Sequence, residues 1–154
     1  MKMVDIGQAL NTLANVGVIL GIVFLAYELR QNTSVARQDA YNSFAQTINE
    51  LNVTISTDVG LSELLSQVNH GASRNDFSPA ERLRVDMFHL ANLRAFESLY
   101  QSVNSGIVDN RYFESLSVVG AFQSPYFLDY WPQARQALSP EFVEYLESNI
   151  PALN

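Results

Sequence analysis

The sequence has no cysteine, and charged residues make up only 16% of its 154 positions. Without cysteine, the chain can form neither disulfide bonds nor thiolate metal sites. Soluble domains usually carry about 25% charged residues. A charge content this low predicts that part of the molecular surface is covered by a membrane or by a partner protein.

Charge is completely absent from the 22 consecutive residues from Ile6 to Tyr27, and the last fifteen of them are nearly all apolar. A helix rises ~1.5 Å per residue, so this run would be ~33 Å long, enough to cross the ~30 Å hydrocarbon core of a bilayer. We therefore predict a single transmembrane anchor over residues 1–27, surrounded by lipid. The alternative is a buried core helix, which seldom needs so long an uncharged run.

A cleaved signal peptide also contains such a run, but it requires a basic start and a small-x-small cleavage site. Lys2 is the only basic residue before the run, and Asp5 offsets its charge. No Ala-x-Ala pattern follows the run. Instead, Tyr27 and Arg30 stand where an interfacial aromatic and a snorkelling cation are expected. These features favour an anchor that is not cleaved.

The net charge of −7 lies entirely in residues 28–154, which contain eight arginines and fifteen acidic residues. An acidic domain repels nucleic acid, so we expect no nucleic-acid partner. Basic residues flank the run almost equally, with Lys2 before it and Arg30 and Arg37 after it. The small excess after the run predicts a single-pass membrane protein with its C-terminal domain in the cytoplasm.

Glycine and proline are both absent over residues 23–58. Apolar residues recur through this stretch with helical spacing, at Leu29, Ala36, Ala40, Phe44, Ile48, Leu51 and Ile55. The pattern predicts one helix from near Val4 to near Ser56, in which residues 28–57 form a stalk that packs on the domain. The polar residues at 31–34 could instead cap a new helix.

The remaining chain, residues 58–154, shows helix start and stop signals and no convincing strand pattern. We predict an all-α fold, with the transmembrane helix extended into the stalk and followed by a small helical bundle. The expected bundle helices cover residues 59–69, 78–105, 109 to about Val119, 124 onward with a break or kink at Pro132, and 139–149.

The helix expected at 78–105 carries the clearest signals. Ser78, Pro79 and Glu81 form a capping-box arrangement with proline in the first turn, and Gly106 follows the expected end. Apolar residues point in every direction from this helix, which predicts a central helix surrounded by other elements. We expect three of them to be largely buried: Leu90, Phe96 and Leu99.

Within the anchor, Gly17 and Gly21 form a Gly-x-x-x-Gly pair. Two glycines one turn apart leave a flat groove where a second membrane helix can approach closely, and Asn15 could add an interhelical hydrogen bond. We predict a helix-packing face that meets a membrane protein partner or a second copy of the chain. The alternative is chance, because glycine is common in membrane helices.

Polar residues on the central helix are the next candidates. Arg94 and Glu97 can pair at i, i+3, and Gln101 lies one turn further on. We predict a buried polar strip with a structural role, and the alternative is the lining of a ligand pocket. Asp86 and His89 match half of a di-iron ligand pattern, which needs a second copy and two more glutamates. We predict no metal site, no cofactor and no catalytic residue.

Four aromatic residues fall on one broad helix face: Tyr126, Phe127, Tyr130 and Trp131. Aromatic residues at this spacing fill cores, and they also anchor interfaces. A core role is the favoured interpretation, and a partner surface is the alternative.

The junction after the apolar run, Phe24-Leu25-Ala26-Tyr27-Glu28-Leu29-Arg30-Gln31-Asn32-Thr33, resembles that of small bacterial membrane-anchored proteins of unknown function, where the pattern is Tyr-Leu-Ala-x-Gln-Ile-Arg-Gln-Asn-Thr. Later stretches are similar to the same family: Ser78-Pro79-Ala80-Glu81-Arg82, Phe96-Glu97, Gly106, and Trp131 followed by Ser139-Pro140-Glu141-Phe142. The chain departs from the family at Glu28, at Pro132 and in having fewer basic residues after the junction. The resemblance implies an anchor followed by a helical domain, and no activity.

Two classes of function fit these features. The first is a non-catalytic accessory or scaffold subunit of a membrane assembly, in which the anchor packs against partner helices. The second is a membrane-tethered ligand-binding or sensory domain, with Arg94 and Glu97 lining its pocket. An enzyme is disfavoured, because two histidines, no cysteine and no catalytic motif leave few groups for chemistry.

Overall fold

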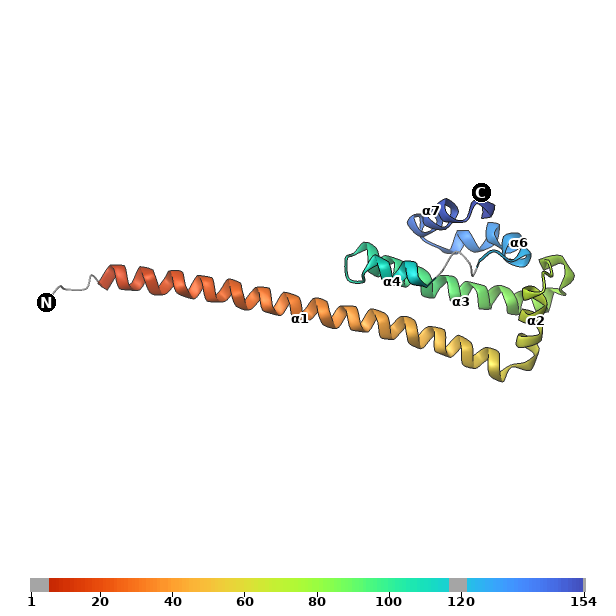
Figure 1. Ribbon diagram of the computed structural model, residues 1–154, viewed down its shortest axis with the longest axis horizontal. Helices are drawn as coiled ribbons and strands as arrows, with labels where there is room; N and C mark the ends of the chain where they lie inside the picture. The colour runs from red at the N-terminus through yellow and green to blue at the C-terminus, as the bar shows by residue number, and fades with distance from the viewer. Residues whose placement is uncertain (1–5, 117–121, 154) are drawn as a thin grey trace. The chain divides into compact units, whose positions relative to one another are not determined.

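The computed structural model describes residues 6–116 and 122–153, and over these residues the chain is helical with no strand (Figure 1). The all-α prediction is therefore confirmed. The α-helices are α1 (Ile6–Thr57), α2 (Val59–Asn69), α3 (Pro79–Asn104), α4 (Asn110–Ser115), α6 (Pro125–Ala134) and α7 (Pro140–Asn149). Three 3-10 turns lie among them: η1 (Arg74–Asp76), η2 (Arg135–Ala137) and η3 (Pro151–Leu153).

Helix α1 is continuous through the polar residues at 31–34 and ends at Thr57. The Thr33 hydroxyl donates to the Leu29 carbonyl at 2.8 Å, so its side chain follows the helix and does not cap a new one. The predicted single helix is confirmed as far as Thr57. Its expected start near Val4 lies outside the described residues, as do Lys2 and Asp5.

The chain divides into two compact units, Met1–Gln38 and Asp39–Asn154. The division falls inside the predicted stalk, so only residues 39–57 of α1 belong to the bundle. Within that unit, Phe44 is buried and its ring centroid lies 5.3 Å from that of Phe96 on α3. Tyr41 meets Tyr112 at 4.6 Å. The apolar stripe read from the sequence is thus the face that this part of α1 uses for packing.

Local signals fix the ends of the bundle helices. Asp58 accepts a hydrogen bond from the Leu61 amide and caps α2. The capping box of Ser78 and Glu81 opens α3 as predicted. Gly71 and Gly106 have positive φ angles of 92° and 73° just after α2 and α3, in the left-handed conformation that favours glycine at helix ends.

The core of the bundle lies between α3 and the C-terminal helices, with contributions from residues 39–57 of α1 and from α2. Its fully buried large side chains are Phe113, Phe122, Tyr126, Phe127, Phe142, Leu93, Leu146, Ile150 and Val85. Helix α3 is central, and Phe96 and Leu99 are buried as expected, whereas Leu90 is half-buried. However, Leu83 and Met87 are 60% and 49% exposed, so α3 has an open face and is not surrounded.

The later helices follow the sequence signals with small differences. Asp109 caps α4, which ends at Ser115, and the expected end near Val119 lies outside the described residues. Helix α6 continues through Pro132 to Ala134 and is therefore not broken at the proline. Proline lacks an N–H group, and the helix ends within a turn of it.

Candidate functional site

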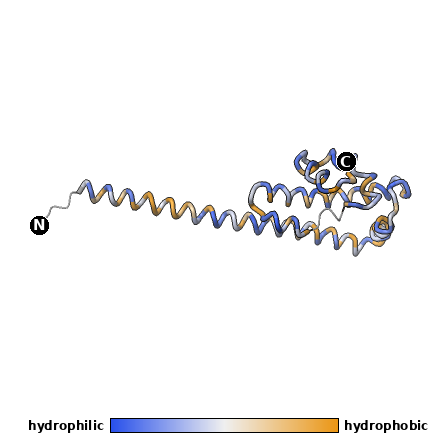
Figure 2. The backbone as a smooth tube through the Cα atoms, turned by 45° about the horizontal axis from the view of Figure 1, so that its top comes forward, coloured by the Kyte–Doolittle hydropathy of each residue, from blue (hydrophilic) through white to orange (hydrophobic). Residues whose placement is uncertain are grey.

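The apolar run on α1 is the most distinctive feature of the described structure. Its large apolar side chains, from Leu10 to Leu29, are between 48% and 73% exposed. Figure 2 shows the same stretch in orange in the N-terminal half of α1. Among the residues that the structure describes, α1 is the one helix long and apolar enough to cross a membrane. None of its most apolar window is buried, which contradicts the alternative of a buried core helix.

The glycine pair lies on this exposed stretch. A Cβ atom added at Gly17 or at Gly21 would meet nothing within 4 Å, and Asn15 is also exposed. No described element of the chain itself occupies the groove between these glycines. A packing role for Gly17, Gly21 and Asn15 therefore stays a prediction about a second molecule.

The predicted buried strip of Arg94, Glu97 and Gln101 is wrong in part. Only Glu97 is buried, whereas the Arg94 side chain is 54% exposed and Gln101 is exposed. Residues three or four apart on a helix point in directions that differ by up to about 60°. Arg94 and Gln101 therefore lie on the open face of α3, whereas Glu97 lies on its covered side. The three residues do not form one enclosed site.

Glu97 acts as a link between two helices. One carboxylate oxygen accepts from the Ser139 amide, at the start of α7, and the other pairs with Arg94 at 2.8 Å. Burial raises the pKa of Glu97, but the hydrogen bonds from Ser139 and Arg94 outweigh it, and the pKa lies below its usual value. The carboxylate is therefore held in its charged form, which suits a structural contact and not a general acid.

A second polar cluster joins η1, α3 and α6. Two nitrogens of Arg74 donate to the two carboxylate oxygens of Asp86, at 2.7 and 3.2 Å. The Tyr126 hydroxyl donates to Asp86 at 3.0 Å, and the Gln133 oxygen accepts from Arg74 at 3.0 Å. Burial, together with the neighbouring Asp86, raises the pKa of Tyr126, so its hydroxyl stays protonated and can donate.

No sequence pattern indicated that Arg74, Asp86 and Tyr126 come together. Arg74 and Asp86 are twelve residues apart across a loop, and Tyr126 is forty residues further along the chain. Such pairs have no fixed helical spacing, so periodicity does not find them. Both carboxylate oxygens of Asp86 are engaged by Arg74, and one of them also accepts from Tyr126.

The aromatic residues of α6 lie in the core and not on a partner surface. Tyr126, Phe127, Tyr130 and Trp131 are all 5% exposed or less. They are covered because α6 lies against α3, η1, η2 and η3 at once. The partner-surface alternative for these four residues is therefore wrong. The Trp131 N–H donates to Glu147 at 3.1 Å, which satisfies the polar edge of the indole.

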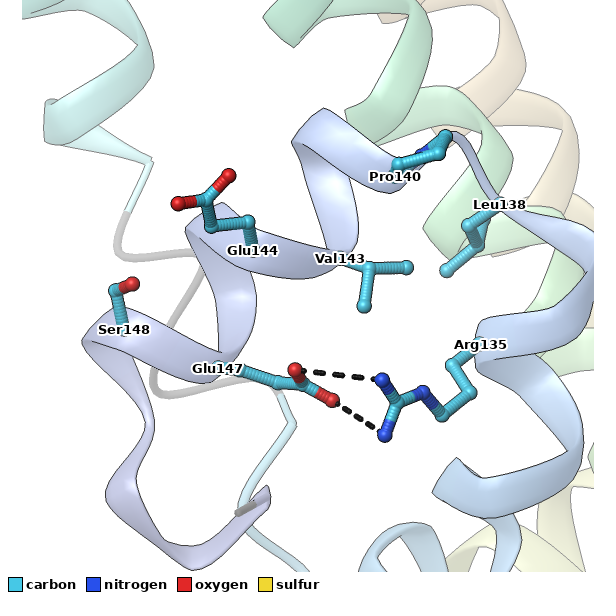
Figure 3. A pocket seen from close by; sticks show the side chains of 7 residues that line it. All are labelled: Arg135, Leu138, Pro140, Val143, Glu144, Glu147 and Ser148. Atoms are coloured by element: carbon cyan, nitrogen blue, oxygen red, sulfur yellow. Dashed lines mark hydrogen bonds and ion pairs between the residues drawn. The ribbon is translucent and has the colours of Figure 1, made fainter.

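A surface hollow of about 550 Å³ lies beside that contact, between η2 and α7. Figure 3 shows Arg135 and Glu147 facing each other across it, with their closest atoms 2.9 Å apart. Each charge in this pair is neutralised by the other, and Glu147 also accepts from Trp131. The polar groups here already serve the packing of α7.

His89 differs from the other buried polar residues. It lies on α3 and is 7% exposed, and its Nε2 atom has no hydrogen-bond partner among the described residues. Aromatic rings of Phe88, Tyr126 and Phe127 surround the imidazole, with centroids 5.5 to 5.9 Å away. Burial lowers the pKa of His89 to about 4, against the opposing effect of Asp86. The ring is therefore neutral at physiological pH.

Comparison with protein-family models, with curated proteins and with solved structures finds no match for this chain. The resemblance to small bacterial membrane-anchored proteins stays a prediction based on the residues quoted above.

Proposed function

We propose that this chain is a non-catalytic accessory or scaffold subunit of a protein assembly in the bacterial inner membrane, anchored by the apolar run of α1. The exposed apolar side chains between Leu10 and Leu29 carry this proposal. Soluble monomers rarely expose contiguous apolar patches larger than a few hundred Å². A bilayer removes such side chains from water, at about 25 cal/mol for each Å² of apolar surface.

The contact with the assembly is made through the glycine face. Contacts between membrane helices rely on close packing, because lipid tails are as apolar as the side chains they replace. The open groove at Gly17 and Gly21 supports such an approach by a partner helix. Self-association of two copies through the same face is the other form of this contact.

The bundle acts as a rigid adaptor on the membrane surface. Its buried charges, Glu97 and Asp86, are engaged in contacts that hold α7 and η1 in place. Arg94 lines a hollow of about 420 Å³ that includes neither Glu97 nor Gln101, and Glu97 already has two partners, so the alternative of one ligand pocket formed by Arg94 and Glu97 together is less favoured. These observations favour a domain built for packing.

Extraction from native membranes tests the proposal. The full chain should remain in the membrane pellet after alkaline carbonate treatment, because the apolar run lies in the hydrocarbon core. Extraction in mild detergent at native abundance, followed by mass spectrometry of co-purifying proteins, should recover a membrane protein at a fixed stoichiometry. Release by carbonate would refute the anchor, and a pure monomer in several mild detergents would refute the subunit role.

A further inference from the structure

A pocket of about 540 Å³ lies in the bundle between the end of α1, α2, α3 and the segment that leads into α6. Ile55, Leu65, Phe88 and Phe122 give it apolar walls, and His89 and Asn92 add polar groups. The described residues that line it include no aspartate, glutamate, lysine or arginine. The volume falls in the range of about 300–1,000 Å³ that small-molecule sites occupy.

His89 is the polar group of this pocket that lacks an explanation. Its Nε2 atom is buried and unpaired, as described above. Leaving a buried polar atom unpaired destabilises the folded state, so native structures rarely do so unless a water or a ligand completes the contact. The surrounding aromatic rings fill space and supply no partner for this atom.

Two other polar side chains around the pocket donate hydrogen bonds to backbone carbonyls. The Asn92 amide nitrogen donates to the Phe88 carbonyl at 2.9 Å, and the Ser62 hydroxyl donates to the Val59 carbonyl at 2.8 Å. An amide oxygen and a hydroxyl oxygen remain able to accept. The described lining therefore offers apolar walls, the neutral imidazole nitrogen of His89 and nearby acceptors. It contains no carboxylate, lysine or arginine.

We propose that this pocket binds a small uncharged molecule with an aromatic or aliphatic body and a hydroxyl group, which forms a hydrogen bond with Nε2 of His89. A hydroxyl both donates and accepts, so it matches either neutral tautomer of the imidazole. A charged ligand would find no carboxylate, lysine or arginine among the described lining residues, and it would lose much of its hydration on entering the pocket. The site does not depend on the proposed scaffold role.

Histidine nitrogen spectroscopy gives a direct test, because the chain has only two histidines. The full chain, labelled with ¹⁵N in its imidazole rings, is placed in lipid nanodiscs near pH 7. It is then titrated with 2-naphthol or, in parallel, with naphthalene, which has the same rings and no hydroxyl. A His70→Gln variant assigns the two ring systems.

We expect 2-naphthol to shift the His89 ring signals with saturation, and naphthalene to bind about tenfold more weakly at equal free concentration. One lost hydrogen bond of about 1.4 kcal/mol corresponds to that ratio. Equal affinity for the two probes would overturn the role of His89. Absence of any saturable shift with either probe would overturn the site, leaving a bound water as the partner of Nε2.

Two matched variants locate the binding. Ser66 lines this pocket and Ser148 lines the hollow of Figure 3, and both are exposed serines on helices. Ser66→Trp should fill the pocket and abolish the shift, whereas Ser148→Trp should leave it unchanged. A shift that persists in Ser66→Trp would show that the probe binds elsewhere and would overturn the proposal. If Ser66→Trp does not fold, the comparison of the two probes on the parent chain still decides the outcome.

Discussion

At the scale of single residues, Phe96 joins two parts of the core. Its ring centroid lies 5.3 Å from that of Phe44 on α1 and 5.8 Å from that of Phe122 before α6. Phe96→Ala should therefore reduce the free energy of unfolding by ~3–5 kcal/mol, the usual cost of removing a buried phenylalanine. Chemical denaturation followed by circular dichroism measures the change.

The control for Phe96 lies on the same helix. Leu83 is 60% exposed, and Leu83→Ala should change the free energy of unfolding by no more than about 0.5 kcal/mol. If the two variants unfolded at the same denaturant concentration, α3 would not be the centre of the bundle.

Glu97 makes the stability of the bundle depend on pH. Its pKa in the folded chain lies below the ordinary value of 4.5, so the carboxylate stabilises the folded state above about pH 4.5. This stabilisation is lost as the pH falls through the folded-state pKa. Glu97→Gln should therefore cost roughly 1–3 kcal/mol at pH 7 and progressively less below pH 4.5, as the parent carboxyl becomes neutral.

Denaturation at a series of pH values checks this behaviour against Glu63→Gln, an exposed position on α2. The control should differ little from the parent chain at every pH. A gap between Glu97→Gln and the parent that stayed constant down to pH 3 would contradict the role given to the charge.

At the scale of elements, the glycine face of α1 gives the prediction closest to function. Gly17→Leu combined with Gly21→Leu keeps the helix apolar, so membrane insertion should survive. The substitution fills the groove, and a contact worth ~0.6–2 kcal/mol is enough to move a weak complex across its dissociation range. We expect normal abundance in the membrane and loss of co-purification with the partner or with a tagged second copy.

The matched control places the same new side chains one position further along the helix. Val18→Leu with Ile22→Leu alters two exposed apolar positions with the same spacing and leaves both glycines in place. This variant should co-purify as the parent does. If the glycine variant also co-purified unchanged, the glycines would face lipid and the partner contact would lie elsewhere.

At the scale of the whole molecule, the sequence predicted the elements better than their surroundings. Proline, glycine and capping side chains act on neighbouring backbone groups, so Ser78 and Gly106 marked helix ends that the structure confirms. The exposed side of α3 was not predictable, because apolar residues on all its faces hide which face is covered. The burial predicted for Arg94 and Gln101 was wrong for the same reason.

The functional groups of the bundle were still harder to predict. Arg74, Asp86 and Tyr126 come together only because a loop and two helices fold back on one another. The pocket beside His89 depends on four separate segments, and no local pattern encodes it. The candidate membrane span was accessible from sequence because length and the absence of charge are the features that define it.

The predicted orientation in the membrane can be tested with reporter enzymes fused to the C-terminus. The basic residues Arg30 and Arg37 after the apolar run slightly outnumber those before it, which favours a cytoplasmic C-terminal domain. A reporter enzyme that is active only in the periplasm, fused after Asn154, should therefore be inactive. A cytoplasmic reporter at the same position should be active, and the reverse pattern would place the bundle outside.

The contact between Glu97 and the Ser139 amide also bears on how the bundle opens. Amides at the start of a helix have no partner within the helix and usually exchange their hydrogen with solvent quickly. Ser139 is the N-cap residue of α7, yet its amide donates to a side chain 42 residues earlier in the sequence. We expect this bond to break together with the separation of α7 from α3, so in deuterated buffer the hydrogen should persist as long as the slowest amides of the core. The exchange rate of the Ser139 amide would thus report the rate of global unfolding of the bundle.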